Sequence, residues 1–413
     1  MVEPDEVQLP LPVAVPAERA LHACKRRDRD RAHRQCAPRE ERPPRHLPLE
    51  CLPVTTHDSP PIDDAGRGNP VKPEPSAGDR YLALISTDTS LQKVLARYAV
   101  PQRGRAISNI FTSVVVYLAL IVAACLALRF SPWVAGALSA VAAGFLLRTF
   151  IVFHDCAHGS FLKSKRTNAL LGAALGVLVC TPFALWRREH AIHHATAGDL
   201  DRRGVGDIQT LTVDEYRASP WWERLRYRLF RNPFVMFGLG PFWVVLLGPR
   251  VVSWKAPRRL QRSVLGTDLT LIAIVAALCW LLGWQGFLIV QLPALLVSGG
   301  IGIWLFYVQH QFEDTYWQSG DTWSYDDAAL KGSSHLRLPR VLQFLTGNIG
   351  LHHVHHLSAR IPNYNLQAAH DANAALHSVP TISLLDGLKA TRLKLWDERQ
   401  RKLVGFRAAR ATR

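Results

Sequence analysis

The sequence predicts an all-α integral membrane protein, with four transmembrane helices in two hairpins and a cytoplasmic helical cap that carries clustered histidines. Three observations lead to this prediction. Four apolar runs are each long enough to cross a bilayer, which takes about twenty helical residues. The segments that follow each pair of runs are rich in Arg and Lys, which marks the cytoplasmic side of a membrane protein. The clustered histidines lie in those basic segments, at or just beyond the ends of the apolar runs.

The four predicted spans pair through short links. The first hairpin joins runs 107–128 and 131–153, and the second joins runs 264–284 and 287–308. Ser131 and Pro132 suit an N-cap and a first helical turn. Each link carries at most one basic residue, whereas segments 154–263 and 309–413 are rich in Arg and Lys. The positive-inside rule therefore predicts that both long segments and both termini face the cytoplasm.

Two further apolar runs, 169–185 and 233–248, are short and interrupted by Gly or Pro. If the first of them crossed the membrane alone, the histidine clusters on its two sides would face opposite compartments. One metal site could not then use both clusters. We therefore expect each run to form an interfacial or re-entrant helix on the cytoplasmic leaflet.

The first eighty residues differ in composition from the rest. They are crowded with Pro, Arg, Asp and Glu, so they cannot bury enough apolar surface to fold, and we expect them to be disordered. The chain is accordingly divided into an arm at 1–80, a membrane domain at 81–400 and a basic tail at 401–413. The cysteines and histidines of the arm fit no compact zinc pattern.

The net charge of +16 raises nucleic acid as a partner. The basic residues lie between long apolar runs, however, and no nucleic-acid-binding motif is present, so that class is rejected. The cysteines of the membrane domain are scattered in or beside apolar stretches. We expect them to pack as small apolar groups and not as a disulfide framework.

Most of the seventeen histidines fall into spaced clusters. The second span leads directly into an H-x-x-x-H pair, and two H-x-x-H-H clusters follow later in the chain. Residues at i, i+3 and i+4 share one face of a helix, so each cluster points its rings in one direction. A further histidine ends the fourth span. The nine candidate ligands are His154, His158, His190, His193, His194, His310, His352, His355 and His356.

A metal site explains these clusters better than surface histidines do, because all three lie on the side assigned to the cytoplasm. Nine imidazoles exceed the four ligands that one zinc ion takes, and imidazole also suits iron and copper. The Glu-x-x-His repeat of soluble di-iron bundles is absent. An all-nitrogen di-iron site is therefore expected. Four histidines break the spacing and are assigned to the core or surface: His335, His353, His370 and His377.

These clusters resemble the three histidine boxes of the membrane fatty acid desaturases. The matching runs are HDCAHGSF at 154–161, HAIHH at 190–194 and HHVHH at 352–356. The flanking runs DLDRRG at 199–204 and IPNYNL at 361–366 resemble the bacterial and plastid-type acyl-lipid Δ12 (omega-6) group. The resemblance covers about residues 90–400. Ala157 is a departure, since the family often has Gly there, but Ala is small and faces away from the ligand pair.

The resemblance implies that the nine candidate histidines ligate two irons, although His310 belongs to no box. It also implies O2-dependent desaturation of an acyl chain held on a membrane glycerolipid, in a bacterial inner membrane with a cytoplasmic active site. Asp155, Asp199 and Asp201 are candidates for accepting a ring N–H of a ligand. Asn348, four residues before His352, is a candidate for a water-mediated contact or for a helix cap.

Two other functional classes are compatible with clustered histidines in a membrane protein. An acyl hydroxylase, an alkane hydroxylase or a carotenoid oxygenase shares the boxes, and the flanking runs favour desaturation over these. A metal transporter needs polar ligands near the middle of its spans, where this sequence has neither histidine nor acid. No flavin or dinucleotide fingerprint occurs, so a separate carrier must supply electrons, and the resemblance implies a ferredoxin or cytochrome b5-type donor.

Overall fold

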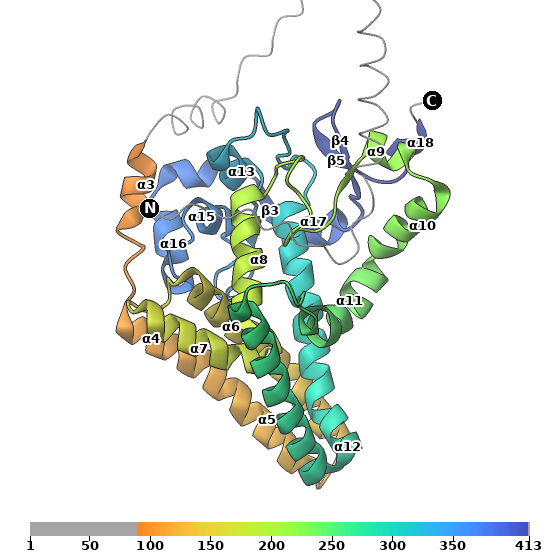
Figure 1. Cartoon of the computed structure of the whole chain (residues 1–413). Helices are drawn as coiled ribbons and strands as arrows, with labels where there is room; N and C mark the ends of the chain where they lie inside the picture. Colours follow the sequence, from red (N-terminus) through yellow and green to blue (C-terminus); the bar gives the residue numbers. More distant parts are fainter. Residues whose placement is uncertain (1–88, 412–413) are drawn as a thin grey trace, which may run out of the picture. The chain divides into compact units, whose positions relative to one another are not determined.

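The computed structural model describes residues 89–411, and the expected arm at 1–80 lies outside this part. The described chain is mostly helical, with two small sheets (Figure 1). This confirms the predicted helical class. The first described helix is α3, at Thr89–Ala96.

The first predicted hairpin corresponds to two long helices. The first is continuous through α4 (Arg103–Ile110), η1 (Phe111–Val115) and α5 (Val116–Ala127), and it is long and apolar enough to cross a membrane. The second is α6 (Pro132–His158), which begins where Ser131 accepts a hydrogen bond from the backbone N–H of Val134. Because α6 continues five residues beyond the predicted span, it carries the first histidine box as its last turn.

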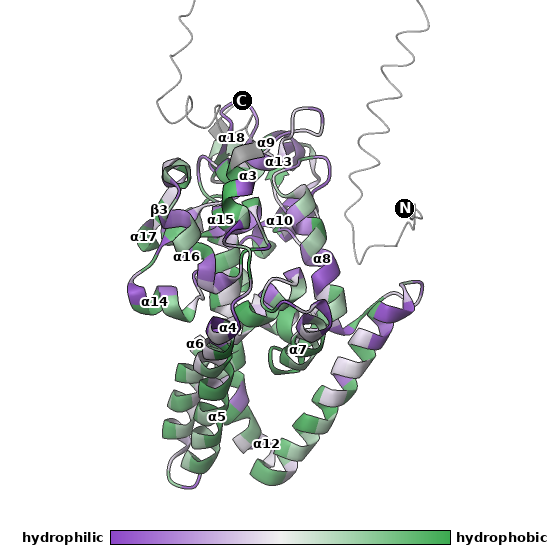
Figure 2. Ribbon diagram, turned by 90° about the vertical axis from the view of Figure 1, so that its left-hand side faces the viewer, coloured by the Kyte–Doolittle hydropathy of each residue, from purple (hydrophilic) through white to green (hydrophobic). Residues whose placement is uncertain are grey.

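The second predicted hairpin corresponds to α12, at Arg258–His310. Gly283 interrupts this helix with φ 70° and ψ 157°, a left-handed conformation that glycine adopts without a steric cost. The two limbs on either side of Gly283 run in opposite directions (Figure 1). Both limbs are largely apolar, as are α5 and α6 (Figure 2). The break falls inside the predicted link at 283–286.

The two shorter apolar runs belong to pairs of helices that meet at a bend. The first lies across α7 (Lys165–Leu178) and α8 (Phe183–Thr196), whose axes differ by 104°. The second follows α10 (Trp221–Phe230) through η2 (Phe234–Leu239), α11 (Gly240–Phe242), η3 (Trp243–Leu247) and η4 (Gly248–Arg250), with a bend of 59°. The first run is divided by its bend and the second run lies beyond its bend, and each helix pair fits a broken span or a re-entrant loop.

Short elements form the rest of the described chain. The helices are α9 (Val213–Ala218), α13 (Tyr325–Lys331), α14 (Arg340–Leu345), α15 (His352–Leu357), α16 (Asn363–Asp371), η5 (Ala374–Ser378), α17 (Leu384–Ala390) and α18 (Ala408–Ala411). In one sheet β4 (Leu395–Asp397) lies between parallel β1 (Leu211–Thr212) and antiparallel β5 (Lys402–Val404). In the other, β2 (His335–Arg337) pairs in parallel with β3 (Thr381–Ser383). Through β5, part of the predicted basic tail packs on the body.

A buried arginine joins three distant parts of this body. Arg231 follows α10, and its side chain is fully buried. It donates to the carbonyls of Gln209 (2.9 Å) and Leu393 (3.2 Å), and to the Gln311 side chain (2.7 Å). It also donates to Tyr307 Oη of α12 at 3.2 Å. The guanidinium therefore fixes the end of α12 against the β1 and β4 segments.

Candidate metal centre

The nine histidines singled out in the sequence form two groups of potential metal ligands. The first group has five rings, and the second has four. Within each group, one nitrogen from every ring lies within 4.8 Å of the corresponding nitrogens of the other rings. The first group is His154, His158, His190, His194 and His355, and the second is His193, His310, His352 and His356.

The first group is assembled from α6, α8 and α15. His154 and His158 are one turn apart at the end of α6, with ring centroids separated by 4.7 Å. The Nε2 atoms of His190 and His194 are 3.2 Å apart, and His194 Nε2 is 3.0 Å from His355 Nε2. The α7–α8 bend allows boxes one and two to meet, although α7 lies between them in sequence.

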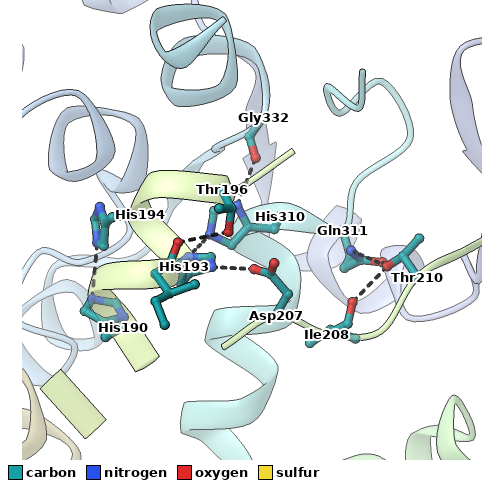
Figure 3. A network of polar contacts seen from close by, with 12 residues as sticks. His190, His193, His194, Thr196, Asp207, Ile208, Thr210, His310, Gln311 and Gly332 are labelled. Carbon is teal, nitrogen blue, oxygen red and sulfur yellow. Dashed lines mark hydrogen bonds and ion pairs between the residues drawn. The ribbon is translucent and has the colours of Figure 1, made fainter. Parts of the chain in front are cut away.

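The second group is assembled from α8, the end of α12 and α15. His193 Nε2 is 3.2 Å from His310 Nε2, and His310 Nε2 is 3.0 Å from His352 Nε2 (Figure 3 shows the first of these contacts). The helix ends at His310, since the next residue, Gln311, leaves the helical conformation. The two groups adjoin, because the rings of His194 and His356 are stacked with centroids 4.2 Å apart.

The outward nitrogens of three rings have fixed hydrogen-bond acceptors. His154 Nδ1 lies 3.2 Å from Asp155 Oδ1, His193 Nδ1 lies 2.5 Å from Asp207 Oδ1, and His310 Nδ1 lies 3.0 Å from the carbonyl of Gly332. Such acceptors hold a ligating imidazole in the tautomer whose Nε2 is free to bind a metal. Figure 3 shows His193 and His310 oriented in this way.

The arrangement fits transition-metal ions held by imidazole. Two nitrogens bound to one ion at about 2.0–2.1 Å are themselves roughly 3 Å apart, which matches the Nε2 separations of 3.0–3.2 Å. The buried Nε2 atoms of His158 and His356 have no hydrogen-bond partner within the described chain. Iron and copper both accept such ligands.

The rings of box three are uncharged at neutral pH. Burial, and next the neighbouring His310 or His154 rings, lower the pKa of His352 and His355 well below the usual 6.5. Burial and then His194 lower the pKa of His356 in the same way. A neutral imidazole has a free lone pair, so these rings need not lose a proton to bind a metal.

The predicted supporting residues lie in different environments. Asp155 Oδ1 contacts His154, while its Oδ2 accepts the backbone N–H of Asn363 at 2.7 Å and the Asn363 side chain at 2.8 Å. Asp199 accepts from Arg202 and from the backbone of Asp201, which itself accepts the Gly320 N–H. Asn348 donates to the Asn363 carbonyl at 3.2 Å. Within residues 89–411, only the first of these four candidates hydrogen-bonds a ring of the two groups.

Asp207 is a supporting residue that the sequence reasoning missed. Its carboxylate accepts from His193 and is nine-tenths buried. The preceding Gly206 has φ +73°, and a Cβ there would lie 2.8 Å from the Glu189 carbonyl. Only glycine lets this loop pass so close to α8. The Gly-Val-Gly-Asp run at 204–207 was the available signal, since two glycines before an acid indicate a tight return of the chain.

The four histidines set aside in the sequence lie together outside the two groups. His353 Nε2 is 3.2 Å from His370 Nδ1, and the His335 and His377 rings lie 4.7 Å and 4.8 Å from the His370 ring. They come from β2, α15, α16 and η5. His353 points away from the second group, although it follows His352 directly, because adjacent residues of a helix face different directions.

A small cavity of about 10 Å³ adjoins the second group. Its lining includes His310 and Asp207, together with Phe306, Tyr316 and Trp317. This volume is about that of one water molecule. The cavity is therefore a place where a single water can reach the edge of the histidine groups.

Comparison with known proteins agrees with this geometry. Residues 131–382 match the protein family described as "Fatty acid desaturase". The chain is 48% identical over 318 residues to a fatty acid desaturase of Bacillus subtilis, which covers 77% of this chain and 90% of that protein. It is 29% identical over 314 residues to the sn-1 oleoyl-lipid 12-desaturase of Synechocystis sp., covering 72% and 83%. It is also 29% identical over 240 residues to the chloroplastic omega-6 fatty acid desaturase of Arabidopsis thaliana, covering 54% and 49%.

Proposed function

Since this chain belongs to the fatty acid desaturase family of membrane oxidoreductases, we propose that it introduces a Δ12 (omega-6) double bond into an acyl chain of a membrane glycerolipid. In this proposal two irons are held by the nine histidines, five rings for one and four for the other. The observation that carries it is the convergence of three boxes and His310 into two adjoining groups.

The irons, when bound, supply the O2-dependent oxidation that an unactivated methylene requires. The chain contributes the positions of the ligands. Asp155 and Asp207 each hold one ring of a group by its Nδ1, and the Gly332 carbonyl holds His310. Because these acceptors lie behind the rings, each ring keeps its Nε2 directed inward before any metal arrives.

The proposed topology has four spans in two hairpins, with the histidine cap and both termini in the cytoplasm of a bacterial inner membrane. Two observations support it. His154 and His190 flank α7 in sequence yet belong to one group, so the chain returns to the same side between them. The Gly283 break turns α12 into two limbs of opposite direction, each long enough for a span.

The Δ12 regiochemistry is supported by the flanking runs after boxes two and three and by the names of the relatives. The Synechocystis relative is an oleoyl-lipid 12-desaturase, and the Arabidopsis relative is an omega-6 desaturase. The boxes do not distinguish an acyl hydroxylase from a desaturase, and the flanking runs favour desaturation. Electrons are proposed to come from an external ferredoxin or cytochrome b5-type protein.

Lipid analysis tests this function directly. The chain is expressed in a host that makes oleate but no diene, and linoleate is expected in the phospholipid fraction. A hydroxy acid would place the protein in the hydroxylase class, and a new monoene from stearate would reject the regiochemistry. His355→Ala should abolish the product, whereas His353→Ala, outside both groups, should retain most of it.

Metal analysis tests the site independently. Purified protein should contain about two irons per chain, because nine imidazoles exceed the needs of one ion. Active protein that contained one zinc and no iron would overturn the assignment.

A further inference from the structure

A surface beside the first histidine group carries five arginines, and its neighbouring acid is Glu189, which interacts electrostatically with Arg188. Arg187 and Arg188 lie in α8, and Arg258, Arg259 and Arg262 lie in the first turns of α12; we call these five residues the basic patch. All five side chains are exposed. Across the part of the chain that the structure describes, none has a carboxylate within 4.0 Å. Hydrophilic residues gather at this start of α12, above its apolar limb (Figure 2).

The two halves of the basic patch are joined by a hydrogen bond. The backbone N–H of Ala184 in α8 donates to Ser263 Oγ in α12 at 3.0 Å. Ala184 lies three residues before Arg187, and Ser263 directly follows Arg262. The cations of α8 and α12 therefore belong to one local surface. Their mutual repulsion is offset when an anionic partner binds.

Trp186 connects this surface with the metal ligands. Its ring is partly exposed and stacks on His190 of the first group, with centroids 4.3 Å apart and an interplanar angle of 21°. It also lies 5.8 Å from the ring of His154. Arg187 is its neighbour in sequence. One aromatic ring thus extends from the basic patch to two rings of the first histidine group.

We propose that the basic patch docks an acidic protein that carries one electron at a time, and that Trp186 provides an approach of that carrier to His190. The inference rests on the proposed function. For each double bond, two carriers are oxidised by one electron each, and one O2 and two protons are consumed. The two methylenes lose two hydrogens, and two water molecules leave, so atoms and charge balance.

An anionic lipid headgroup would also be attracted to these cations. The position of Trp186 favours the carrier. A lipid headgroup requires only the positive charge of the basic patch, whereas the rate of electron transfer falls steeply as the distance between the carrier's redox centre and the metal site grows. A ring in contact with a metal ligand shortens that separation. Opposite charge chiefly speeds the encounter of two proteins, and this effect weakens as salt rises.

Carrier affinity tests the docking surface without a measurement of activity. The iron-loaded chain is placed in nanodiscs of neutral phosphatidylcholine, and binding of a plant-type ferredoxin and of cytochrome b5 is measured as salt is raised. Arg187→Gln/Arg188→Gln should weaken the binding of at least one carrier about fivefold at low salt and flatten its salt dependence. The control Lys165→Gln/Arg166→Gln, two exposed cations of α7, should change affinity less than twofold.

Two results would overturn the docking surface. In one, the arginine variant binds both carriers as tightly as the unaltered chain. In the other, the variant differs from the unaltered chain only when the nanodiscs contain phosphatidylglycerol, which would assign the basic patch to a lipid headgroup.

The rate of reduction tests Trp186. Trp186→Leu should slow reduction of the iron centre by the carrier several-fold relative to reduction by dithionite, and Trp186→Phe should restore most of that ratio. An unchanged ratio in Trp186→Leu would reject the approach through this ring. A different result would reject the proposed function itself: the unaltered chain would bind no iron, or would form no double bond even when dithionite reduces it.

Discussion

Replacement of Arg231 by methionine should cost about 4 kcal/mol of stability. The guanidinium is fully buried and makes five hydrogen bonds, at 2.7–3.3 Å, to neutral acceptors on three segments of the chain. Methionine fills similar space but donates nothing, so buried carbonyl and side-chain oxygens lose their donors at about 1–3 kcal/mol each. Removal of the guanidinium also recovers the several kcal/mol that burial of its charge costs, so the net loss of about 4 kcal/mol is smaller than the sum over the five acceptors.

Unfolding in mixed micelles, followed by tryptophan fluorescence as the denaturing detergent is raised, measures this loss. Arg226→Met is the matched control, because Arg226 lies exposed on α10, the helix that Arg231 follows, and it should stay within about 0.5 kcal/mol of the unaltered chain. Since Gln311 adjoins His310, Arg231→Met should also release iron faster to a chelator. A loss below about 1 kcal/mol, equal to that of the control, would refute the role given to this network.

Three further results are expected. Asp207→Asn should weaken metal retention about 10- to 100-fold in a chelator competition, because His193 loses a charged acceptor, while Asp201→Asn, which supports only a loop, should retain metal normally. Burial, and next the nearby Arg231 charge, lower the pKa of Lys394 to about 7. The unfolded chain therefore binds more protons between pH 7 and 10.5, so stability should rise with pH in that range, and Lys394→Met should flatten the curve. In a cysteine-free background, an impermeant thiol reagent added outside should label Gln285→Cys and not Ser164→Cys; labelling of the latter would contradict the proposed topology.

The helices and histidine clusters that follow a local pattern of apolar or spaced residues were predictable from the sequence. Apolar length gave the positions of α5, α6 and both limbs of α12, because a span needs a fixed number of apolar residues whatever its neighbours are. Helical spacing predicted which rings of each box share a face, and in the structure His353 lies outside both histidine groups. The first histidine box directly follows the second predicted span in sequence, so its position at the end of α6 was predictable.

Contacts between distant loops could not be predicted in this way. Asp207 reaches His193 only because the backbone at Gly206 passes close to α8, and no periodicity encodes that approach. Asp199 was a candidate from the sequence and Asp207 was not, yet Asp199 accepts from Arg202 and from its own loop. The contact between the His335 and His370 rings likewise depends on how β2 packs beside α16, which is a property of the tertiary structure.

The order of the histidines along the chain has a consequence for how the protein is built. Four of the five rings in the first group precede residue 200, and only His355 comes later. In the second group, by contrast, three of four rings follow residue 309. A ribosome adds about 5–20 residues each second, so the first group is nearly complete several seconds before the second can exist. Four of the five ligands of the first group are therefore synthesised before the second hairpin, and both groups are completed only when box three, with His352, His355 and His356, has been made.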